Sequence, residues 1–313
     1  MIKDVVSISL PVDETFRIRK NRIRNGTGTK RFSLITGIHG DELEGQYIAF
    51  RLNQVLNENI ESLDGIVDIY PGANPLGIDS DTRGIPAFDL DMNRIFPGRM
   101  DGDMNEYVAS CLVEDIAGSD LAMDIHASNI FLTEIPQIRI SEITAERLVP
   151  LAEKANVDLI WVHGAATVLE ATLAYTLNDR NTPTLVVEAG VGMRITKEYG
   201  DQMITGILSL LKEIGIYSGE CESVRKPVIS SDPDDVIFLN APSSGIFIKT
   251  SEHGAILEEG DEVGIIVNPL SGEVLSRLTS PGKGWLFTIR EYPVVDQGSL
   301  IARILRKLPE ETR

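Results

Sequence analysis

The ten residues Ser33–Glu42, with the sequence Ser-Leu-Ile-Thr-Gly-Ile-His-Gly-Asp-Glu, constrain the fold of this chain more than any other stretch. An apolar run ends at Gly37, and two residues with metal-binding side chains, His39 and Glu42, follow three positions apart. A helical pattern of apolar residues begins directly after them. The stretch predicts a buried strand that delivers two ligands to the start of a helix. A lone His-x-x-Glu also occurs as a purely structural feature, so other residues must support the site.

The composition is that of a globular protein with a sizeable core. The chain has 313 residues, of which 42% are hydrophobic, which is enough for one large domain or for a large and a small one. Its net charge of −18 argues against nucleic acid as a partner, because phosphate binding needs clustered Lys and Arg. Cys111 and Cys221 show no CxxC spacing and are expected to be free thiols. With no signal-peptide pattern and no long apolar run, we expect a cytoplasmic protein without membrane contact.

Strand and helix patterns alternate over the first two thirds of the chain. Strand patterns lie at 4–36 (two runs around a turn signal), 66–70, 120–126, 158–163 and 183–190, and helix patterns lie at 42–57, 104–117, 142–155, 167–178 and 196–214. This alternation is typical of an α/β layer fold with a largely parallel central sheet.

The pattern changes after about residue 217. A polar connector over 218–235 leads to short strand patterns at 245–249, 261–267, 272–275 and 284–289, separated by Gly and Pro turns. We therefore predict two domains, an α/β domain over 1–217 and a connector with a small all-β domain over 218–313. The β domain resembles a biotinyl/lipoyl-like half barrel, but its central hairpin lacks the modifiable Lys of a carrier.

Chemically useful side chains follow several of the predicted strands. They are His39 with Glu42, the polar loop 83–94, His126 and Glu188. Since ligands bind at the carboxyl ends of strands in such sheets, these groups are expected to converge on one cleft. Two imidazoles and one carboxylate form a common catalytic zinc set that leaves a position for water. A further carboxylate can take a proton from that water, and an Arg can stabilise the developing oxyanion.

Each of these residues also has a structural explanation. His126 can be a hydrogen-bonded core imidazole, and His163, which ends another strand, can either enter the cleft or serve the structure. Arg83 and Arg94 can pair with nearby acids, namely Asp79, Asp89 or Asp91. Glu188 is harder to explain in this way, because a carboxylate that ends a buried strand needs a partner or a function.

Two further residues are open to more than one interpretation. Asp124 faces the same side of its predicted strand as His126, so it is either an orienting partner of that imidazole or a buried structural acid. His253 lies in a Ser-Glu-His-Gly loop of the β domain, and we expect it to be solvated.

The order of these motifs resembles that of the succinylglutamate desuccinylase/aspartoacylase family, which is related to zinc carboxypeptidases of the M14 type. The motifs span about residues 33–215 and are Gly37–Glu42, Asn74-Pro75, Arg83, Asp91–Arg94, Asp124–His126 and Val187–Gly190. The resemblance implies a zinc-carboxypeptidase-like three-layer fold with a mostly parallel or mixed central sheet. It also implies a small all-β C-terminal domain that partly covers the active site.

The resemblance also implies a role for each motif residue. His39, Glu42 and His126 would bind one zinc ion per chain. Glu188 would act as general base and then donate a proton to the leaving amine, while Arg83 would assist the oxyanion. The substrate carboxylate would be held by Asn93 and Arg94, as the planar guanidinium matches a carboxylate. We add His163 as a candidate substrate-binding residue.

We therefore expect a zinc-dependent amidohydrolase that cleaves the amide bond of an N-acyl amino acid or a similar small N-acyl compound. One alternative is a carboxypeptidase acting on short peptides, which would use the same metal and base. Another is a non-catalytic, metal-containing binding protein, although such a protein is expected to lack the base, and Glu188 is present. The acyl group and the amine stay open. A homo-oligomer is expected only because symmetric dimers are the commonest assemblies.

Overall fold

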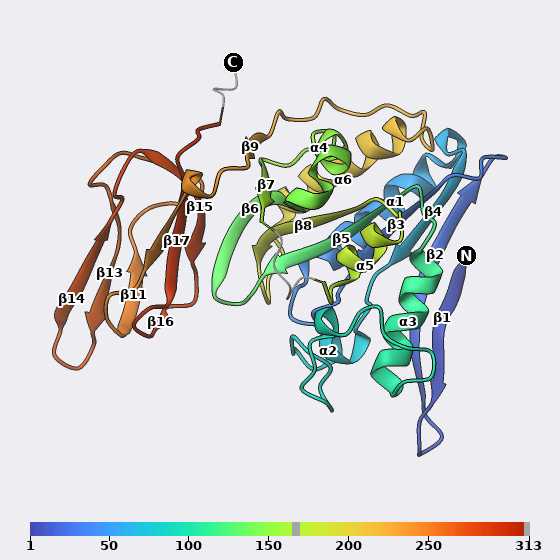
Figure 1. Ribbon diagram of the computed structural model, residues 1–313, viewed down its shortest axis with the longest axis horizontal. Coiled ribbons are helices and arrows are strands. Elements are labelled where there is room, and N and C mark those ends of the chain that lie inside the picture. The colour runs from blue at the N-terminus through green and yellow to red at the C-terminus, as the bar shows by residue number, and fades with distance from the viewer. Residues whose placement is uncertain (165–169, 310–313) are drawn as a thin grey trace.

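A wide mixed sheet carries the candidate site residues at the ends of its central strands. The computed structural model describes residues 1–164 and 170–309. Its first part contains β1 (Ile2–Ser9), β2 (Thr15–Asn25), β3 (Arg31–Thr36), α1 (Glu44–Glu58), β4 (Gly65–Tyr70), α2 (Pro75–Asp79), α3 (Met104–Ile116), β5 (Leu121–Ser128), β6 (Leu132–Ser141), α4 (Ala145–Ala152), β7 (Leu159–His163), α5 (Leu173–Asp179), β8 (Thr184–Val191), α6 (Lys197–Glu213) and β9 (Val228–Ser230) (Figure 1). Its last part contains β10 (Val236–Asn240), β11 (Gly245–Lys249), β12 (Ile256–Leu257), β13 (Glu262–Asn268), β14 (Glu273–Thr279), β15 (Gly284–Arg290), β16 (Val294–Val295) and β17 (Leu300–Leu305).

The large sheet has the strand order β1-β2-β4-β3-β5-β8-β6-β15-β17-β10, and β7, β9 and β12 join it off this path. Its central strands β4, β3, β5 and β8 are parallel to one another, while β6 is antiparallel to β8. A second, antiparallel sheet has the order β14-β13-β11-β16. The predicted α/β fold with a mixed sheet and additional C-terminal β structure is thus confirmed.

Helices cover both faces of the sheet. On one face α1, α4 and α6 pack on the core through residues such as Ile48, Leu148 and Ile207, and on the other face α3 and α5 pack through Leu112 and Leu177. All eight residues of β5 are buried, because a parallel strand between two helical layers meets apolar side chains on both sides. In the described residues, no helix is both long enough and apolar enough to cross a membrane.

The helix predicted at 167–178 is shorter than expected. Residues 167–169 lie outside the described residues, and α5 begins only at Leu173. The reason is local, since the Thr172 hydroxyl accepts a hydrogen bond from the Tyr175 amide and thereby caps the first turn.

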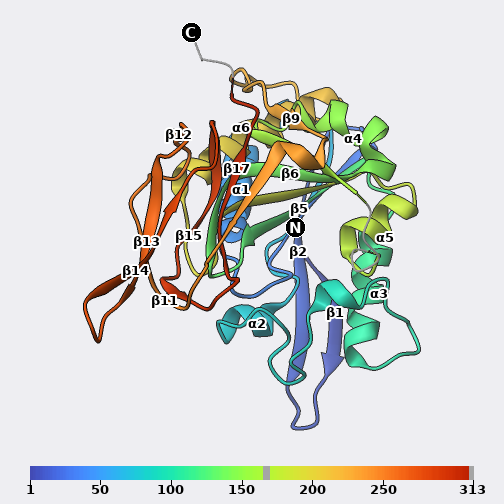
Figure 2. The same cartoon turned by 60° about the vertical axis from the view of Figure 1, so that its left-hand side comes forward.

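The C-terminal strands continue the large sheet through β15, which pairs with β6 in an antiparallel register that places Thr288 opposite Glu134. In Figures 1 and 2 these strands, coloured orange to red, lie beside the α/β layers. The connector also contributes β9, which pairs with β7. The division at residue 217 stays a prediction, since strands from both sides of it share one sheet.

The expectation that His253 is solvated is wrong. The imidazole is partly buried, and its Nε2 atom lies 3.1 Å from the Phe287 carbonyl oxygen, to which it donates. Its Nδ1 atom accepts from the Tyr199 hydroxyl of α6 at 3.2 Å. The loop that carries His253 packs against α6 of the α/β layers. No local sequence pattern predicts that contact.

Candidate metal centre and active site

Three candidate ligands from separate parts of the chain meet at one edge of the sheet. His39 and Glu42 follow β3, and His126 lies near the end of the adjacent parallel strand β5. Their ligand atoms all lie within 4.8 Å of one another, and all three side chains are buried. His39 Nδ1 is 2.8 Å from Glu42 Oε1, and His126 Nδ1 is 2.9 Å from Glu42 Oε2. We call these residues the ligand triad.

Two glycines let the backbone between β3 and α1 adopt the required path. Gly37 has a φ of +67°, a backbone conformation that residues other than glycine rarely adopt. Gly40 approaches the backbone of α2 so closely that an added Cβ atom would lie 2.0 Å from the Gly77 carbonyl carbon. The Gly40 amide donates to the Arg83 carbonyl oxygen at 3.2 Å, which joins the ligand loop to the loop of the candidate arginines.

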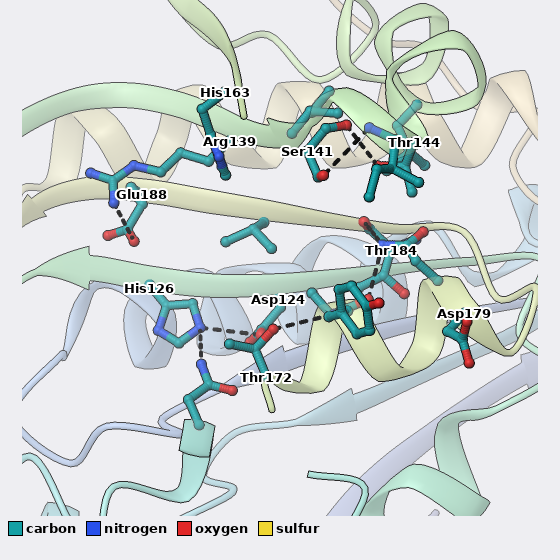
Figure 3. A pocket seen from close by; sticks show the side chains of 18 of the residues that line it. Asp124, His126, Arg139, Ser141, Thr144, His163, Thr172, Asp179, Thr184 and Glu188 are labelled. Carbon is teal, nitrogen blue, oxygen red and sulfur yellow. Dashed lines mark hydrogen bonds and ion pairs between the residues drawn. The ribbon is translucent and has the colours of Figure 1, made fainter. Parts of the chain in front are cut away.

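Both histidines of the ligand triad turn the same ring nitrogen toward Glu42. The opposite nitrogen of each ring faces a carboxylate. His39 Nε2 is 3.0 Å from Asp91 Oδ1. His126 Nε2 is 3.1 Å from Asp124 Oδ2, as Figure 3 shows. Donation of the Nε2 proton to a carboxylate leaves the Nδ1 lone pair facing the triad, as metal-binding histidines require. The geometry favours the orienting role for Asp124. The sequence offers Asp91 as a partner for the arginines and as part of the motif Asp91–Arg94, and no sequence spacing predicts its contact with His39.

The electrostatics of the triad favour a positive charge. Burial by itself would raise the pKa of Glu42, but the imidazoles of His126 and His39 outweigh it and hold that pKa below its usual range. Burial would lower the pKa of both histidines, but Asp91 and Glu42 raise that of His39, while Asp124 and Glu42 raise that of His126. Three buried or half-buried carboxylates therefore surround two imidazoles. Such a donor set fits a divalent cation, and zinc in particular.

Glu188 lies on β8 directly beside His126 in the parallel pairing of β5 and β8. Its Oε1 atom accepts from Arg139 Nη1 at 3.3 Å (Figure 3). Burial raises the pKa of Glu188 to about 7, although the charge of Arg139 opposes the rise. A carboxyl group that titrates near neutral pH is suited to accepting and returning a proton. No sequence motif contains Arg139, and the sequence patterns predict no strand where β6 lies.

The two candidate arginines stand near the triad and also pair with acids. Arg83 Nη1 is 2.9 Å from Glu42 Oε1, and Arg83 Nε is 3.5 Å from Asp91 Oδ2. Arg94 Nη1 is 3.9 Å from the same Asp91 oxygen. Their side chains are 41% and 44% exposed, so both guanidinium groups are accessible to a ligand. The structural and functional interpretations thus coexist, with Asp91 as the shared partner.

Asn93 contacts the ligand triad directly, whereas His163 lines the adjoining cavity. Asn93 is buried, with Nδ2 3.4 Å from His126 Nε2 and Oδ1 accepting from the Leu173 amide. His163 ends β7 and its Nδ1 donates to the Gly164 carbonyl oxygen, but it lines the same cavity as His39 and Glu188. A substrate contact for either residue stays a prediction.

Two cavities adjoin the triad. A cavity of about 720 Å³ extends from His39 and Glu188 along β6 and β8 to α4 and α5. A second one, of about 400 Å³, shares these two residues and reaches Glu134 of β6 and Arg303 of β17. A ligand near the triad therefore meets walls from both the α/β layers and the C-terminal strands.

Known proteins resemble the chain in sequence and in fold. An N-alpha-acetyl-L-2,4-diaminobutyric acid deacetylase from Halomonas elongata is 26% identical over 291 residues, which are 90% of this chain and 79% of that protein. The product-bound structure of the ectoine utilization protein EutE (DoeB) from Ruegeria pomeroyi superposes with a TM-score of 0.81 at 21% identity, covering 96% of this chain and 93% of that chain. A succinylglutamate desuccinylase/aspartoacylase from Rhodobacter sphaeroides gives a TM-score of 0.80 at 23% identity, covering 98% and 96%.

The family assignment rests on a match over more than half of the chain. Residues 28–214 match the model of the succinylglutamate desuccinylase/aspartoacylase catalytic domain. This range contains the ligand triad, Glu188 and both candidate arginines, in the order that the resemblance of the sequence motifs predicted. The chain belongs to the succinylglutamate desuccinylase/aspartoacylase family.

Proposed function

We propose that this protein is a zinc-dependent amidohydrolase that removes the acyl group from an N-acyl amino acid. The observation that carries the proposal is the position of Glu188, a buried carboxyl beside a triad of two imidazoles and a carboxylate. The deacetylase from Halomonas elongata supports an N-acetyl amino acid as the first substrate class to test.

Each residue of the site has a separate role in the proposed hydrolysis of the amide bond. His39, Glu42 and His126 would hold the zinc ion, which when bound polarises the scissile carbonyl group and activates the attacking water. The Glu188 carboxylate takes a proton from that water and passes it to the leaving amine. Arg83 stabilises the negative charge that develops on the carbonyl oxygen, and Arg94 with Asn93 binds the substrate carboxylate.

Metal content is the first measurement. We expect about one zinc per chain in the purified protein, as for a catalytic zinc site, and loss of that zinc in His39→Ala and in His126→Ala. Mass spectrometry measures the metal, and thermal unfolding shows whether each variant keeps its fold. A wild-type protein that stays metal-free after addition of zinc would contradict the proposal.

Substrate screening then separates the candidate activities. N-acetyl and N-succinyl amino acids and short peptides are offered to the zinc-loaded enzyme, and release of free amine is followed. Hydrolysis of an N-acyl amino acid supports the proposal. Hydrolysis of peptides alone would assign a carboxypeptidase, and zinc binding without hydrolysis of any of them would indicate a binding protein.

The variant Glu188→Gln tests the base directly. Its amide keeps the size of the side chain but cannot accept the proton, so kcat should fall by about 10²–10⁴-fold while zinc stays bound. Steady-state kinetics on the substrate found in the screen measure the effect. Turnover at the wild-type rate would remove Glu188 from the mechanism.

A further inference from the structure

Glu188 is the first member of a row of charged side chains that leads away from the ligand triad. Arg139 donates to Glu188 through Nη1 and to both oxygens of Glu134 through Nη2, at 2.9 and 2.7 Å. Glu134 is fully buried, and it also accepts from Arg303 Nη1 and, at 3.3 Å, from the Thr288 hydroxyl. Two carboxylates and two guanidinium groups thus alternate in one connected network.

The sheet topology brings this network together from both parts of the chain. Glu134 of β6 lies opposite Thr288 of β15, and Thr288 lies opposite Arg303 of β17. Opposite residues on neighbouring strands point to the same face, so the three side chains form a row across the sheet. The last charged member of the network, Arg303, therefore comes from the C-terminal strands and not from the matched catalytic range of 28–214.

Aromatic rings hold the two guanidinium groups in place. The Arg139 and Arg303 carbons Cζ lie 5.7 and 5.6 Å from the ring centre of Trp161, and Arg303 also lies 5.8 Å from that of Phe238. Such contacts restrict the plane of each guanidinium, and hence the direction of its N–H groups.

In the described part of the chain, Arg139 is the side chain that links Glu188 to Glu134. Arg139 Nε, Arg303 Nε and both amide atoms of Gln137, which lies opposite Glu188, are buried without a hydrogen-bond partner among the described residues. Loss of Arg303 would leave Arg139 as the one guanidinium group in the described residues that contacts Glu134 and Glu188. The bidentate contact would then draw Arg139 toward Glu134 and weaken its hold on Glu188.

We propose that Arg303 is a positioning residue for the hydrolytic site, which holds the Glu188 carboxylate in its reactive place through Glu134 and Arg139. The C-terminal strands β15 and β17 are then part of the machinery of proton transfer and not only a wall of the cavity. This inference rests on the proposed function, in which Glu188 is the base. A displacement of about 1 Å at such a group can reduce the rate about 100-fold.

The variant Arg303→Gln tests the inference, with Arg277→Gln as the matched control. Arg277 lies on β14 and forms an exposed ion pair with Glu262, away from the network. We expect Arg303→Gln to lower kcat by about 10–100-fold with little change in KM and with zinc retained, and the control to be unchanged. Arg303→Lys should restore only part of kcat, because lysine keeps the charge but not the planar donor pair.

A double-variant cycle separates positioning from other roles. If Arg303 acts through Glu188, Arg303→Gln should cause little further loss in the Glu188→Gln background. An equal loss in both backgrounds, a rise in KM alone, or a wild-type kcat in Arg303→Gln would each overturn the inference.

Two further measurements keep the result interpretable. Should Arg303→Gln fail to fold, Thr288→Val removes a single hydrogen bond to Glu134 and leaves all charges in place. A smaller loss of kcat that disappears in the Glu188→Gln background supports the inference, and an unchanged kcat contradicts it. Normal turnover of Glu188→Gln itself would overturn the proposed base as well, whereas a normal Arg303→Gln overturns the positioning role alone.

Discussion

Among single residues, the partners of the two imidazoles explain most about the candidate metal centre. His39 and His126 each direct Nε2 to a carboxylate, Asp91 in one case and Asp124 in the other. A carboxylate in this position fixes the tautomer of the ring and increases the electron density at Nδ1. The two aspartates are therefore placed to orient both imidazoles of the candidate ligand triad.

The variant Asp124→Asn tests this orienting role. The amide keeps the size of the side chain but removes the negative charge that faces His126, so zinc affinity should fall by about 10–100-fold. Competition with a chelator measures the affinity. Asp89→Asn, an exposed change on the loop before Asp91, is the control and should bind zinc like the wild type. Equal affinity in the two variants would show that Asp124 serves the structure alone.

Among the elements, the turn between β3 and α1 has a narrow geometric tolerance. It must reverse direction after β3, expose two ligands and pass directly over the backbone of α2. The close approach of Gly40 to Gly77 and Ile78 leaves no room for a side chain, since the atoms that an added Cβ would meet belong to the backbone.

We therefore expect Gly40→Ala to weaken both the fold and the metal site. The unfolding free energy should fall by about 1–3 kcal/mol, the usual cost of overpacking, and zinc should bind more weakly because His39 and Glu42 are displaced. Urea unfolding and zinc competition measure the two effects. Gly282→Ala is the control, since its added Cβ would have only the end of the Arg306 side chain nearby, at 3.7 Å. A Gly40→Ala protein as stable as the control would disprove the close contact.

In the whole molecule, the C-terminal strands are joined to the α/β layers at several places, of which two bear on the site and on the stability. One is the continuous pairing of β6 with β15, which carries the row of charges from Glu188 to Arg303. The other is the contact of His253 with Tyr199 of α6. Two such contacts on different elements restrict the relative motion of the two parts, so that Arg303 stays in register with Glu134.

The contact of His253 makes the stability depend on pH. Burial lowers the pKa of His253 in the folded protein below the ordinary value of 6.5, although its bond to the Phe287 carbonyl opposes this. As the pH falls, His253 therefore binds a proton in the unfolded chain before it does so in the folded protein. The contribution of His253 to the unfolding free energy is therefore fully present above the pKa of the unfolded chain. It is lost as the pH falls toward the lower pKa of His253 in the folded protein.

We expect the unfolding free energy to fall more steeply in the wild type than in His253→Gln between about pH 7.5 and about pH 5.5. Urea unfolding of both zinc-loaded proteins measures the two unfolding free energies. In their difference, the contributions of the other histidines cancel. Tyr199→Phe, which loses only the hydroxyl contact, should keep most of the slope. Parallel pH curves for wild type and His253→Gln would contradict the burial of this imidazole.

The sequence by itself determined the class of the fold and the residues of the ligand triad. Apolar periodicity is a local property, and it predicted most strands and helices of the α/β layers, although not β6 or α2, and the change to β structure near residue 217. The parallel arrangement of strands then places His39, Glu42, His126 and Glu188 at one edge, because the carboxyl ends of parallel strands meet there.

Only the tertiary structure decided how these residues are supported. The partners Asp91, Arg139 and Arg303 lie on a loop or inside ordinary strands, and nothing in their spacing links them to the triad. The positions of Arg139 and Arg303 depend on the antiparallel pairing of β6 with β8 and β15 and of β15 with β17, which joins residues that are distant in the chain. For the same reason the contact of His253 was missed. Local patterns report which face of an element is apolar, whereas charge pairing depends on which strands become neighbours.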